Sequence, residues 1–374
     1  MTAAQRVESK PPYVVPSMAE VNALPHNGFR VASTFSGCGG SSLGYRMAGF
    51  RVLWASEFVP AAVETYRANA AAGTVVDTRD IREVTAAQLC DAAGVAPGGL
   101  DILDGSPPCA SFSTVGKLDA GWGVVRKYSE TRQRTDDLFF EFARLVEGVQ
   151  PRVFVAENVF GLVKGPAKGY FKLVLKALRD CGYTVSARLL DAAWLGVPQS
   201  RKRLIFVGVR RDLVVPPVFP RPLPYQYPVA EALPSLDART MRLINDTGGY
   251  FGMGDVTDRT CPTLCVEGTK FLVDDASGTP IVCDPETGQS LVTGFKRDCR
   301  TRRGGIYRYR GAVRRLTLGE ARALSGFPAD FVLTGTHAQR WERLGRAVPP
   351  VMMGHIAAAV RDEVLSPLRA RGVI

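Results

Sequence analysis

Residues 29–48 read FRVASTFSGCGGSSLGYRMA, and this stretch decides the fold. It begins with a strand-like run to Phe35, continues through a glycine-rich turn at residues 36–40, and ends in a helix-like segment. Glycines let the backbone approach a cofactor closely, and the start of a helix supplies N–H donors that lack intrahelical partners. The stretch therefore predicts the nucleotide-binding unit of an α/β protein, although a glycine turn that binds no ligand has the same composition.

Two further strand-like runs end beside residues that carry chemistry. Residues 51–56 end before Glu57, about 20 residues beyond the glycine turn, where an acid can hold ribose hydroxyls. Residues 100–104 are followed by a turn and then by Pro107-Pro108-Cys109. Open α/β sheets place their chemistry at the carboxyl ends of strands, and the two prolines fix the direction of the thiol. We therefore predict that Cys109 is a nucleophile, although a cysteine without such neighbours is more often a packing residue.

Together these stretches resemble the DNA cytosine-5 methyltransferase family, and the resemblance continues in order along most of the chain. The matching segments are Thr34 to Gly40, Glu57, Asp80-Ile81, Asp104 to Ser113, Glu157-Asn158-Val159, Gln199 to Arg203, Arg315 to Pro328 and Gly345 to Pro350. The resemblance implies that S-adenosylmethionine binds at Phe35, Ser36, Gly37, Cys38, Gly39, Gly40, Glu57, Asp80, Ile81, Asp104, Pro107, Arg346 and Val348. It also implies a fold: a Rossmann-like α/β methyltransferase domain with a second, smaller β-rich target-recognition domain.

The resemblance implies catalytic roles for Cys109, Glu157, Arg201 and Arg203. Carbon 5 of cytosine is a poor nucleophile, so the Cys109 thiolate would add to carbon 6 and activate carbon 5 toward the methyl group of the cofactor. Glu157 would hold the base at N3 and at its exocyclic amine, and Arg201 or Arg203 would bind the carbonyl oxygen. A nearby guanidinium would lower the pKa of the thiol. The base must also flip out of the duplex, because its face is inaccessible in a stacked helix.

The charge of the chain favours an anionic partner, which the resemblance implies to be double-stranded DNA. The formal net charge is +11, and nine basic residues face one acidic residue between Lys296 and Arg315. Residues 112–135 have the glycine-rich, basic composition of a loop that follows a nucleophile. The predicted DNA-binding residues are Lys117, Arg126, Lys127, Arg297, Arg300, Arg302, Arg303, Arg308 and Arg310. A solvated surface loop and a solvated charge run are the alternatives for these two stretches.

The sequence predicts a discontinuous catalytic domain with a recognition domain inserted into it. Seven prolines between Pro216 and Pro234 exclude a regular helix or central strand and indicate a linker. Beyond it, short apolar runs at residues 270–273, 280–283 and 290–293 predict strands. A capping-box pattern at Thr317 to Glu320 predicts a helix start, and a last helix over about residues 351–368 is expected to pack on the first strand–helix units. The expected boundaries are a flexible arm at 1–27, a catalytic domain at 28–212 plus 313–374, and a target-recognition domain at 213–312.

Location and partners follow from simpler counts. No apolar stretch approaches the length of a membrane span, residues 1–27 lack the order of a signal peptide, and the eight cysteines are scattered. We therefore expect a cytoplasmic protein that contacts no membrane and acts as a monomer. The resemblance implies a bacterial or phage-encoded protein that associates with the nucleoid, and it leaves open whether a cognate restriction enzyme accompanies it. Cys261, Cys265, Cys283 and Cys299 fall in one region but lack paired C-x-x-C spacing, so we expect no metal.

One departure from the family suggests a second activity. Arg346 stands where the family has an asparagine close to the transferring methyl group, so an arginine would face a sulfonium of like charge. A DNA phosphate, Glu157, the amino-acid carboxylate of the cofactor or a carboxylate on the transferred group could compensate. The last option predicts a carboxymethyltransferase that uses carboxy-S-adenosylmethionine, with Arg346 binding the carboxylate. Further alternatives are a catalytically weak DNA-binding protein and an RNA substrate, although the Cys-Phe-Thr signature of the RNA branch is absent from the recognition region.

Overall fold

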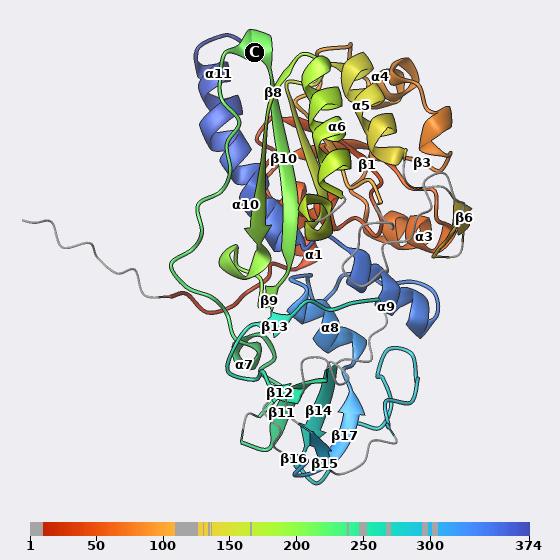
Figure 1. The fold of residues 1–374 in the computed structure, drawn as a ribbon, viewed down its shortest axis with the longest axis vertical. Coiled ribbons are helices and arrows are strands. Elements are labelled where there is room, and N and C mark those ends of the chain that lie inside the picture. Colours follow the sequence, from red (N-terminus) through yellow and green to blue (C-terminus); the bar gives the residue numbers. More distant parts are fainter. Residues whose placement is uncertain are drawn as a thin grey trace, which may run out of the picture.

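A seven-stranded sheet forms the centre of the larger part of the molecule (Figure 1). The computed structural model of the chain describes residues 10–108, 126–129, 131–133, 135, 137–164, 167–237, 239–246, 253–266, 271–293, 298–300 and 306–374. The strands of the large sheet are β1 (Arg30–Thr34), β2 (Arg51–Ser56), β3 (Val75–Asp77), β4 (Ile102–Gly105), β7 (Val153–Val159), β8 (Tyr183–Asp191) and β10 (Lys202–Arg210).

The strand order of this sheet is β3-β2-β1-β4-β7-β10-β8. All neighbouring strands are parallel except β10, which is antiparallel to both β7 and β8. The order reverses between β1 and β4, because the chain moves outward in one direction from β1 and in the other from β4. The loops that follow these two strands therefore open on the same crevice, where α/β sheets bind their ligands.

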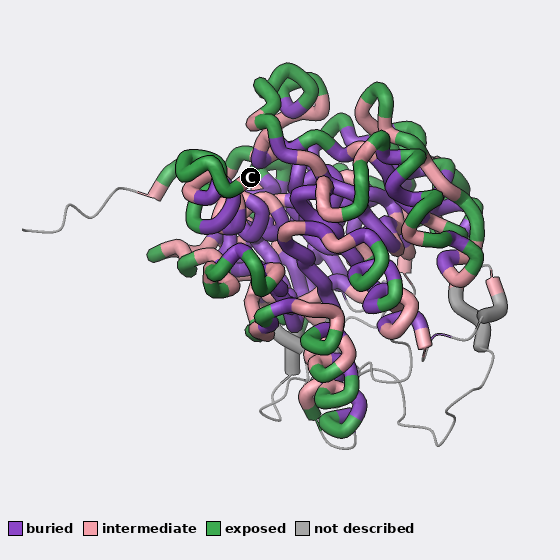
Figure 2. Tube along the Cα trace, turned by 90° about the horizontal axis from the view of Figure 1, so that it is seen from above, coloured by how far each residue is buried: buried purple, intermediate pink, exposed green. Residues whose placement is uncertain are grey.

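Both faces of the sheet are buried, which explains the nearly continuous apolar strands. Val31 packs on one face and Ala32 on the other, and Val155 and Phe154 divide in the same way. One face is covered by α2 (Gly40–Met47), α10 (Pro350–Val360), the π-helix η6 (Arg361–Leu365) and α11 (Ser366–Ala370). The other face is covered by α4 (Ala86–Ala93), α5 (Leu138–Val149) and α6 (Ala167–Asp180). Figure 2 shows the buried residues gathered at the centre of this layered body.

The predicted strand–turn–helix units are confirmed. The runs 29–35, 51–56 and 100–104 correspond to β1, β2 and β4, and α2 begins at Gly40, one residue before the expected position. The C-terminal helix runs without interruption through α10, η6 and α11, and it packs on α2 as expected. Helix α3 (Pro60–Asn69) connects β2 to β3.

A second, smaller sheet forms the other end of the molecule (Figure 1). Its order is β12-β11-β14-β17, and its strands are β11 (Met241–Asp246), β12 (Met253–Asp255), β14 (Phe271–Asp275) and β17 (Ala312–Arg315). A separate hairpin joins β15 (Asp298–Arg300) to β16 (Ile306–Arg308). Residues 271–273 of the first predicted run lie in β14, as expected, and Lys270 lies outside the described residues. The runs 280–283 and 290–293 form only isolated bridges, at Cys283–Ser290 and Val292–Arg314, so the prediction of strands there is wrong.

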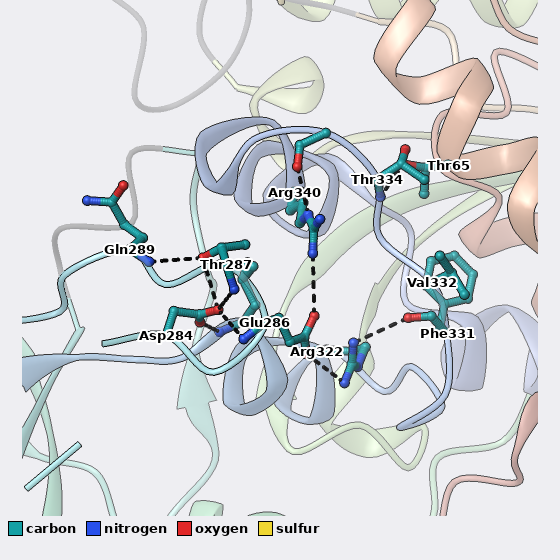
Figure 3. A network of polar contacts seen from close by, with 12 residues as sticks. Thr65, Asp284, Glu286, Thr287, Gln289, Arg322, Phe331, Val332, Thr334 and Arg340 are labelled. Carbon is teal, nitrogen blue, oxygen red and sulfur yellow. Dashed lines mark hydrogen bonds and ion pairs between the residues drawn. The ribbon is translucent and has the colours of Figure 1, made fainter. Parts of the chain in front are cut away.

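The turn at residues 284–287, between these two runs, is held to the neighbouring helices by hydrogen bonds and ion pairs (Figure 3). Asp284 is buried, and its carboxylate accepts N–H groups from Glu286, Thr287 and Leu318. Leu318 starts α8 (Leu318–Leu324), so Asp284 supports the capping box that Thr317 and Glu320 form there, as the sequence predicts. The Asp284 carboxylate therefore accepts the hydrogen bonds of backbone N–H groups that would otherwise pair with a neighbouring strand.

The same turn reaches a second helix through ion pairs. Glu286 lies 2.9 Å from Arg322 of α8 and 3.9 Å from Arg340 of α9 (His337–Arg346) (Figure 3). Figure 1 shows α8 and α9 between the two sheets. These helices therefore connect the small sheet to the body that carries the glycine turn.

The boundaries of the parts differ from those expected. Strand β17 extends to Arg315, and β13 (Cys261–Pro262) pairs with β9 (Gln199–Ser200) of the larger part. One apolar cluster contains Leu43 of α2 together with Val273 of β14, so the two parts share a core. Within the proline-rich segment, Val229–Ala232 forms a single helical turn, α7, because Pro228 is tolerated as its N-cap.

The prediction of a flexible arm is wrong for residues 10–27. Ser17 and Glu20 form a capping box that starts α1 (Met18–Ala23), and Val21 is buried in the shared core. Tyr13 donates to the carbonyl of Ala323 over 3.0 Å and packs against Tyr227. These contacts join segments far apart in the sequence, which is why local composition did not indicate them.

The remaining short elements are β5 (Arg126–Tyr128), β6 (Thr131–Gln133), η1 (Ile81–Glu83), η3 (Phe160–Val163), η4 (Ala192–Trp194) and η5 (Arg211–Leu213). Within the described ranges, no helix has both the length and the apolar character needed to cross a membrane.

Candidate active site

The glycine turn lies at the carboxyl end of β1, where Gly37 is half-buried and the other turn residues are buried. Phe35 has a φ of 52° and Gly39, the N-cap of α2, has a φ of 95°, so the chain reverses sharply here. Gly37 has a φ of 56°, and no atom lies within 4 Å of the position that a Cβ would take. Ser36 donates its main-chain N–H to the carbonyl oxygen of Ser56 and its hydroxyl to the carbonyl oxygen of Ser33. The open space beside the turn therefore lies next to the Cα atom of Gly37.

The inner side of the turn packs against the segment after α9. A Cβ on Gly40 would lie 2.1 Å from the carbonyl oxygen of Val348, which no backbone contact tolerates. The thiol of Cys38 is buried and lies 3.8 Å from the carbonyl oxygen of Arg343. Burial raises the pKa of Cys38 to about 11, so this cysteine is a packing residue and not a second nucleophile.

Gly40→Ala is expected to destabilise the protein by about 1–3 kcal/mol, because the methyl group must displace the backbone at Val348. Gly169→Ala is the matched control: Gly169 lies in α6 with open space around it, and alanine there should be neutral or stabilising by up to about 1 kcal/mol. Urea unfolding of both variants measures the difference. Equal midpoints would contradict the packing described for Gly40.

Glu57 closes the turn from the end of β2. Its carboxylate accepts main-chain N–H groups from Gly37 at 2.7 Å, Val59 at 2.7 Å and Phe58 at 2.9 Å. Burial raises its pKa, while these hydrogen bonds and the positive charge of Arg343 act in the opposite direction. An acid held rigidly beside a glycine turn is suited to accept ribose hydroxyls.

Asp104 is the last residue but one of β4, the strand next to β1. It is 1 % exposed and accepts hydrogen bonds from Ser33 at 2.9 Å and Tyr45 at 3.2 Å. Burial raises its pKa to about 7, and the negative charge of Glu157 adds to the increase. The crevice therefore holds a carboxyl group that titrates near neutral pH.

Asp104 is expected to make the protein less stable as the pH rises from about 5 to 7. Its pKa is about 7 in the folded chain against a reference value of 3.8, so the folded protein binds more protons in this window. The free energy of unfolding should fall by about 1 kcal/mol per pH unit, and Asp104→Asn should remove this slope. Urea unfolding at several pH values measures it, and parallel curves for the two proteins would contradict the prediction.

The predicted adenine-contacting pair lies at η1, beyond β3. The Asp80 carboxylate caps η1 and pairs with Arg82 at 3.0 Å, and Arg82 also pairs with Asp137 at 2.7 Å. Ile81 is buried at 4 % exposure in the core beneath. The backbone of this pair is thus fixed, while the Asp80 side chain is half-buried.

The described chain stops at Pro108, so the predicted nucleophile Cys109 and the basic residue Lys117 lie outside the described residues. Pro107 is buried, and its carbonyl oxygen accepts a hydrogen bond from Asn158 at 3.3 Å. Asn158 follows Glu157 in β7, so this bond ties the approach to Cys109 to the neighbouring strand. Arg126 and Lys127 lie in β5, for which the structure describes the backbone.

Glu157 and Arg203 face each other from neighbouring antiparallel strands. Arg203 Nε lies 2.8 Å from Glu157 Oε1, and the two side chains are 14 % and 11 % exposed. The pair lies at the end of β7 and the start of β10, in the crevice beside Asp104. Such a charge-assisted hydrogen bond fixes the direction of the carboxylate.

Arg201 lies deeper and has different partners. Its guanidinium donates to the carbonyl oxygens of Gly345 at 2.9 Å and Leu264 at 3.2 Å, and its Nε is buried without a hydrogen-bond partner among the described residues. Burial lowers its pKa to about 9, and the charge of Arg203 adds to the decrease. Of the two arginines that the sequence left open for the carbonyl oxygen, Arg203 is therefore the one beside Glu157.

The counter-ion of Arg346 is a residue that the sequence analysis missed. Arg346 Nε lies 2.7 Å from Glu342 Oε1 in the same helix, α9. None of the four compensating groups expected from the sequence is this partner. The signal was present, because an acid four residues before an arginine is the favourable order for a helical ion pair.

The predicted DNA-binding residues of the small part are described only in part. Arg297, Arg302 and Arg303 lie outside the described residues, and Arg300 is described by its backbone. Arg308 and Arg310 are exposed. Arg310 donates its main-chain N–H to the carboxylate of Asp274, and its guanidinium lies 4.0 Å from the same carboxylate.

The four cysteines between residues 261 and 299 are described only in part. Cys261 is buried, Cys283 is exposed on the bridged turn, and the side chain of Cys299 is not described. In the portion of the chain that the structure describes, no three His, Cys, Asp or Glu residues come together as metal ligands.

Comparison with known proteins agrees with this geometry. Residues 29–254 match the family described as C-5 cytosine-specific DNA methylase. The chain is 30% identical over 344 residues to the type II methyltransferase M1.HphI of Haemophilus parahaemolyticus, covering 87% of this chain and 85% of that protein. It is 26% identical to M.NgoPII of Neisseria gonorrhoeae over 92% of this chain and 98% of that protein. A prophage-encoded protein of E. coli, described as a DNA modification methyltransferase, has the same fold, with a TM-score of 0.59 and 21% identity over 91% of this chain and 100% of that chain.

Proposed function

Because the chain belongs to the C-5 cytosine-specific DNA methylase family, we propose that it methylates carbon 5 of a flipped cytosine with Cys109 as the nucleophile. The observation that carries this proposal is the Glu157–Arg203 pair at 2.8 Å, beside the strand end that leads to Cys109. A fixed carboxylate and a fixed guanidinium are the two groups that a cytosine needs at N3 and at its carbonyl oxygen.

The residues around the glycine turn fit S-adenosylmethionine. Open space lies beside the Cα atom of Gly37, and Glu57 presents a half-buried carboxylate next to it. When bound, the cofactor supplies a methyl group on a positively charged sulfur. The glycine turn would hold its amino-acid part, Glu57 its ribose, and Asp80 with Ile81 its adenine.

The protein's own steps concern the thiol and the base. Cys109 would add as a thiolate to carbon 6, and Glu157 would protonate N3, so that carbon 5 gains electron density. Arg203 would bind the carbonyl oxygen while keeping Glu157 in place. After methyl transfer, a water molecule would take the proton from carbon 5, the Cys109 thiolate would leave carbon 6, and N3 would return its proton to Glu157, which restores the aromatic ring. Arg201, which holds the carbonyl oxygens of Leu264 and Gly345, would position the segment that contains Arg346.

Carboxymethyl transfer is the second candidate, and it rests on Arg346. The ion pair with Glu342 weakens its basis, because the arginine already has a carboxylate partner within the chain. Under this candidate a carboxylate of the cofactor would replace Glu342 as that partner. Arg346→Asn should then reverse any preference for carboxy-S-adenosylmethionine, and an unchanged preference would exclude this candidate.

Nucleoside mass spectrometry of DNA tests both candidates. Purified protein is incubated with unmethylated bacterial DNA and either S-adenosylmethionine or its carboxy form. We expect 5-methylcytosine as the main product. A main product of 5-carboxymethylcytosine would support the second candidate, and DNA binding without either product would support a catalytically weak DNA-binding protein. Location with the nucleoid and a partner restriction enzyme are further parts of the proposal.

A further inference from the structure

Glu342 holds two arginines with one carboxylate. Its Oε1 lies 2.7 Å from Arg346 Nε, and its Oε2 lies 3.0 Å from Arg343 Nη2. The Glu342 side chain is 15 % exposed, that of Arg343 is 3 % exposed and that of Arg346 is 33 % exposed. The three side chains thus form a compact, largely buried cluster with one more positive than negative charge.

A third contact makes this cluster more than a pair along a helix surface. Ser129, at the turn between β5 and β6, donates its hydroxyl to Glu342 Oε2 at 3.1 Å and accepts from Arg343 Nη2 at 2.8 Å. An exposed helical ion pair contributes only a few tenths of a kcal/mol and needs no such neighbours. The ring of Glu342, Arg343 and Ser129 fixes the carboxylate between the two guanidiniums.

The backbone that carries this cluster packs against the glycine turn. The carbonyl oxygen of Arg343 lies 3.8 Å from the thiol of Cys38, and the carbonyl of Val348 touches Gly40. The positive charge of Arg343 opposes the rise in pKa that burial causes in Cys38 and in Glu57. The end of α9 is thus a wall of the crevice that the turn and Glu57 form.

We propose that Glu342 is a positioning residue that sets the charge at the cofactor site and thereby favours the cationic methyl donor over its neutral product. This inference rests on the proposed function, since it takes S-adenosylmethionine as the ligand of the glycine turn. By neutralising one of two arginine charges and holding Arg346 along α9, the carboxylate lowers the positive potential that a sulfonium meets. S-adenosylhomocysteine has no sulfonium charge and is insensitive to that potential.

Titration calorimetry of the full chain with S-adenosylmethionine and S-adenosylhomocysteine tests the proposal. The measured quantity is the ratio of the two Kd values, donor over product. Glu342→Gln keeps the shape of the side chain but removes its charge, and we expect the ratio to rise about tenfold. Adding Arg346→Asn to Glu342→Gln restores the net charge of the cluster, and the ratio should return toward that of the unmodified protein.

Ser129→Ala is the matched control, because it removes a hydrogen bond to Glu342 without changing the charge. The ratio should stay within about twofold of that of the unmodified protein. A ratio that is unchanged in Glu342→Gln, or that rises equally in Ser129→Ala, would overturn the inference and leave Glu342 a structural residue. An unmodified protein that binds neither compound would instead overturn the proposed function, and the inference with it.

Discussion

Cys109→Ser is expected to lower the rate of methyl transfer to DNA by about four to six orders of magnitude, the effect of losing a covalent nucleophile. A cysteine thiol is a few per cent ionised at neutral pH and can be activated further by a nearby cation, whereas a serine hydroxyl stays protonated without a dedicated base. We expect Arg203 to supply this cation, since its strand β10 is separated from β4 only by β7, which carries Glu157. Transfer of labelled methyl groups to DNA under single-turnover conditions measures the loss.

Cys283→Ser provides the control for this measurement. Cys283 is exposed on the turn of the smaller part, so its replacement should leave the transfer rate within about twofold. Cofactor affinity should be retained in both variants, because neither thiol belongs to the glycine turn. If Cys109→Ser transferred methyl groups at a rate near that of the unmodified protein, Cys109 would not be the nucleophile, and the proposed covalent mechanism would be wrong.

The elements that carry the crevice could be predicted from local sequence. A strand buried on both faces and a glycine turn before a helix are short-range signals, and they located β1, β2, β4 and α2 to within about two residues. Glu57 followed from its distance along the chain to the turn. Its three backbone partners could not be foreseen, because they depend on how β2 meets the loop after β1.

Long-range packing explains the predictions that were wrong. The prolines near the N-terminus suggested a loose arm, but Tyr13 and Val21 bury their side chains against residues near position 323 and in the shared core. The runs 280–283 and 290–293 have strand composition, yet the buried Asp284 takes the backbone donors of the turn between them. In each case a tertiary partner overrode a local preference.

Arg346 shows the limit most clearly. Taken from the sequence, it lacked a counter-ion, which led to a hypothesis about the transferred group. The helix α9 places Glu342 one turn away and removes that requirement. The spacing of Glu342 and Arg346, four residues apart, can be recognised in the sequence. The contacts of Arg343 and Ser129 with the Glu342 carboxylate depend on the fold and cannot.

Glu157→Gln is expected to lower the transfer rate by about two to four orders of magnitude, the usual contribution of a general acid. An amide of the same shape cannot protonate N3, and it cannot balance the charge of Arg203, whose side chain is 14 % exposed. The resulting unpaired guanidinium also costs stability, so thermal unfolding must show that the variant is folded at the assay temperature. DNA affinity should change far less than the rate, because under the proposed mechanism the carboxylate would contact a single base.

The matched control uses the same substitution at Glu141, which pairs with Arg144 at 2.8 Å on the surface of α5. Glu141→Gln should leave both the rate and the stability nearly unchanged, since an exposed pair contributes about 1 kcal/mol or less. The two ion pairs have the same groups and the same length, 2.8 Å, and differ in location. Only the Glu157–Arg203 pair lies in the crevice beside Asp104, so a difference between the variants reports the effect of that location. Equal rates in the two variants would mean that the Glu157–Arg203 pair only supports the sheet, and the protonation of the base would then require another acid in the crevice.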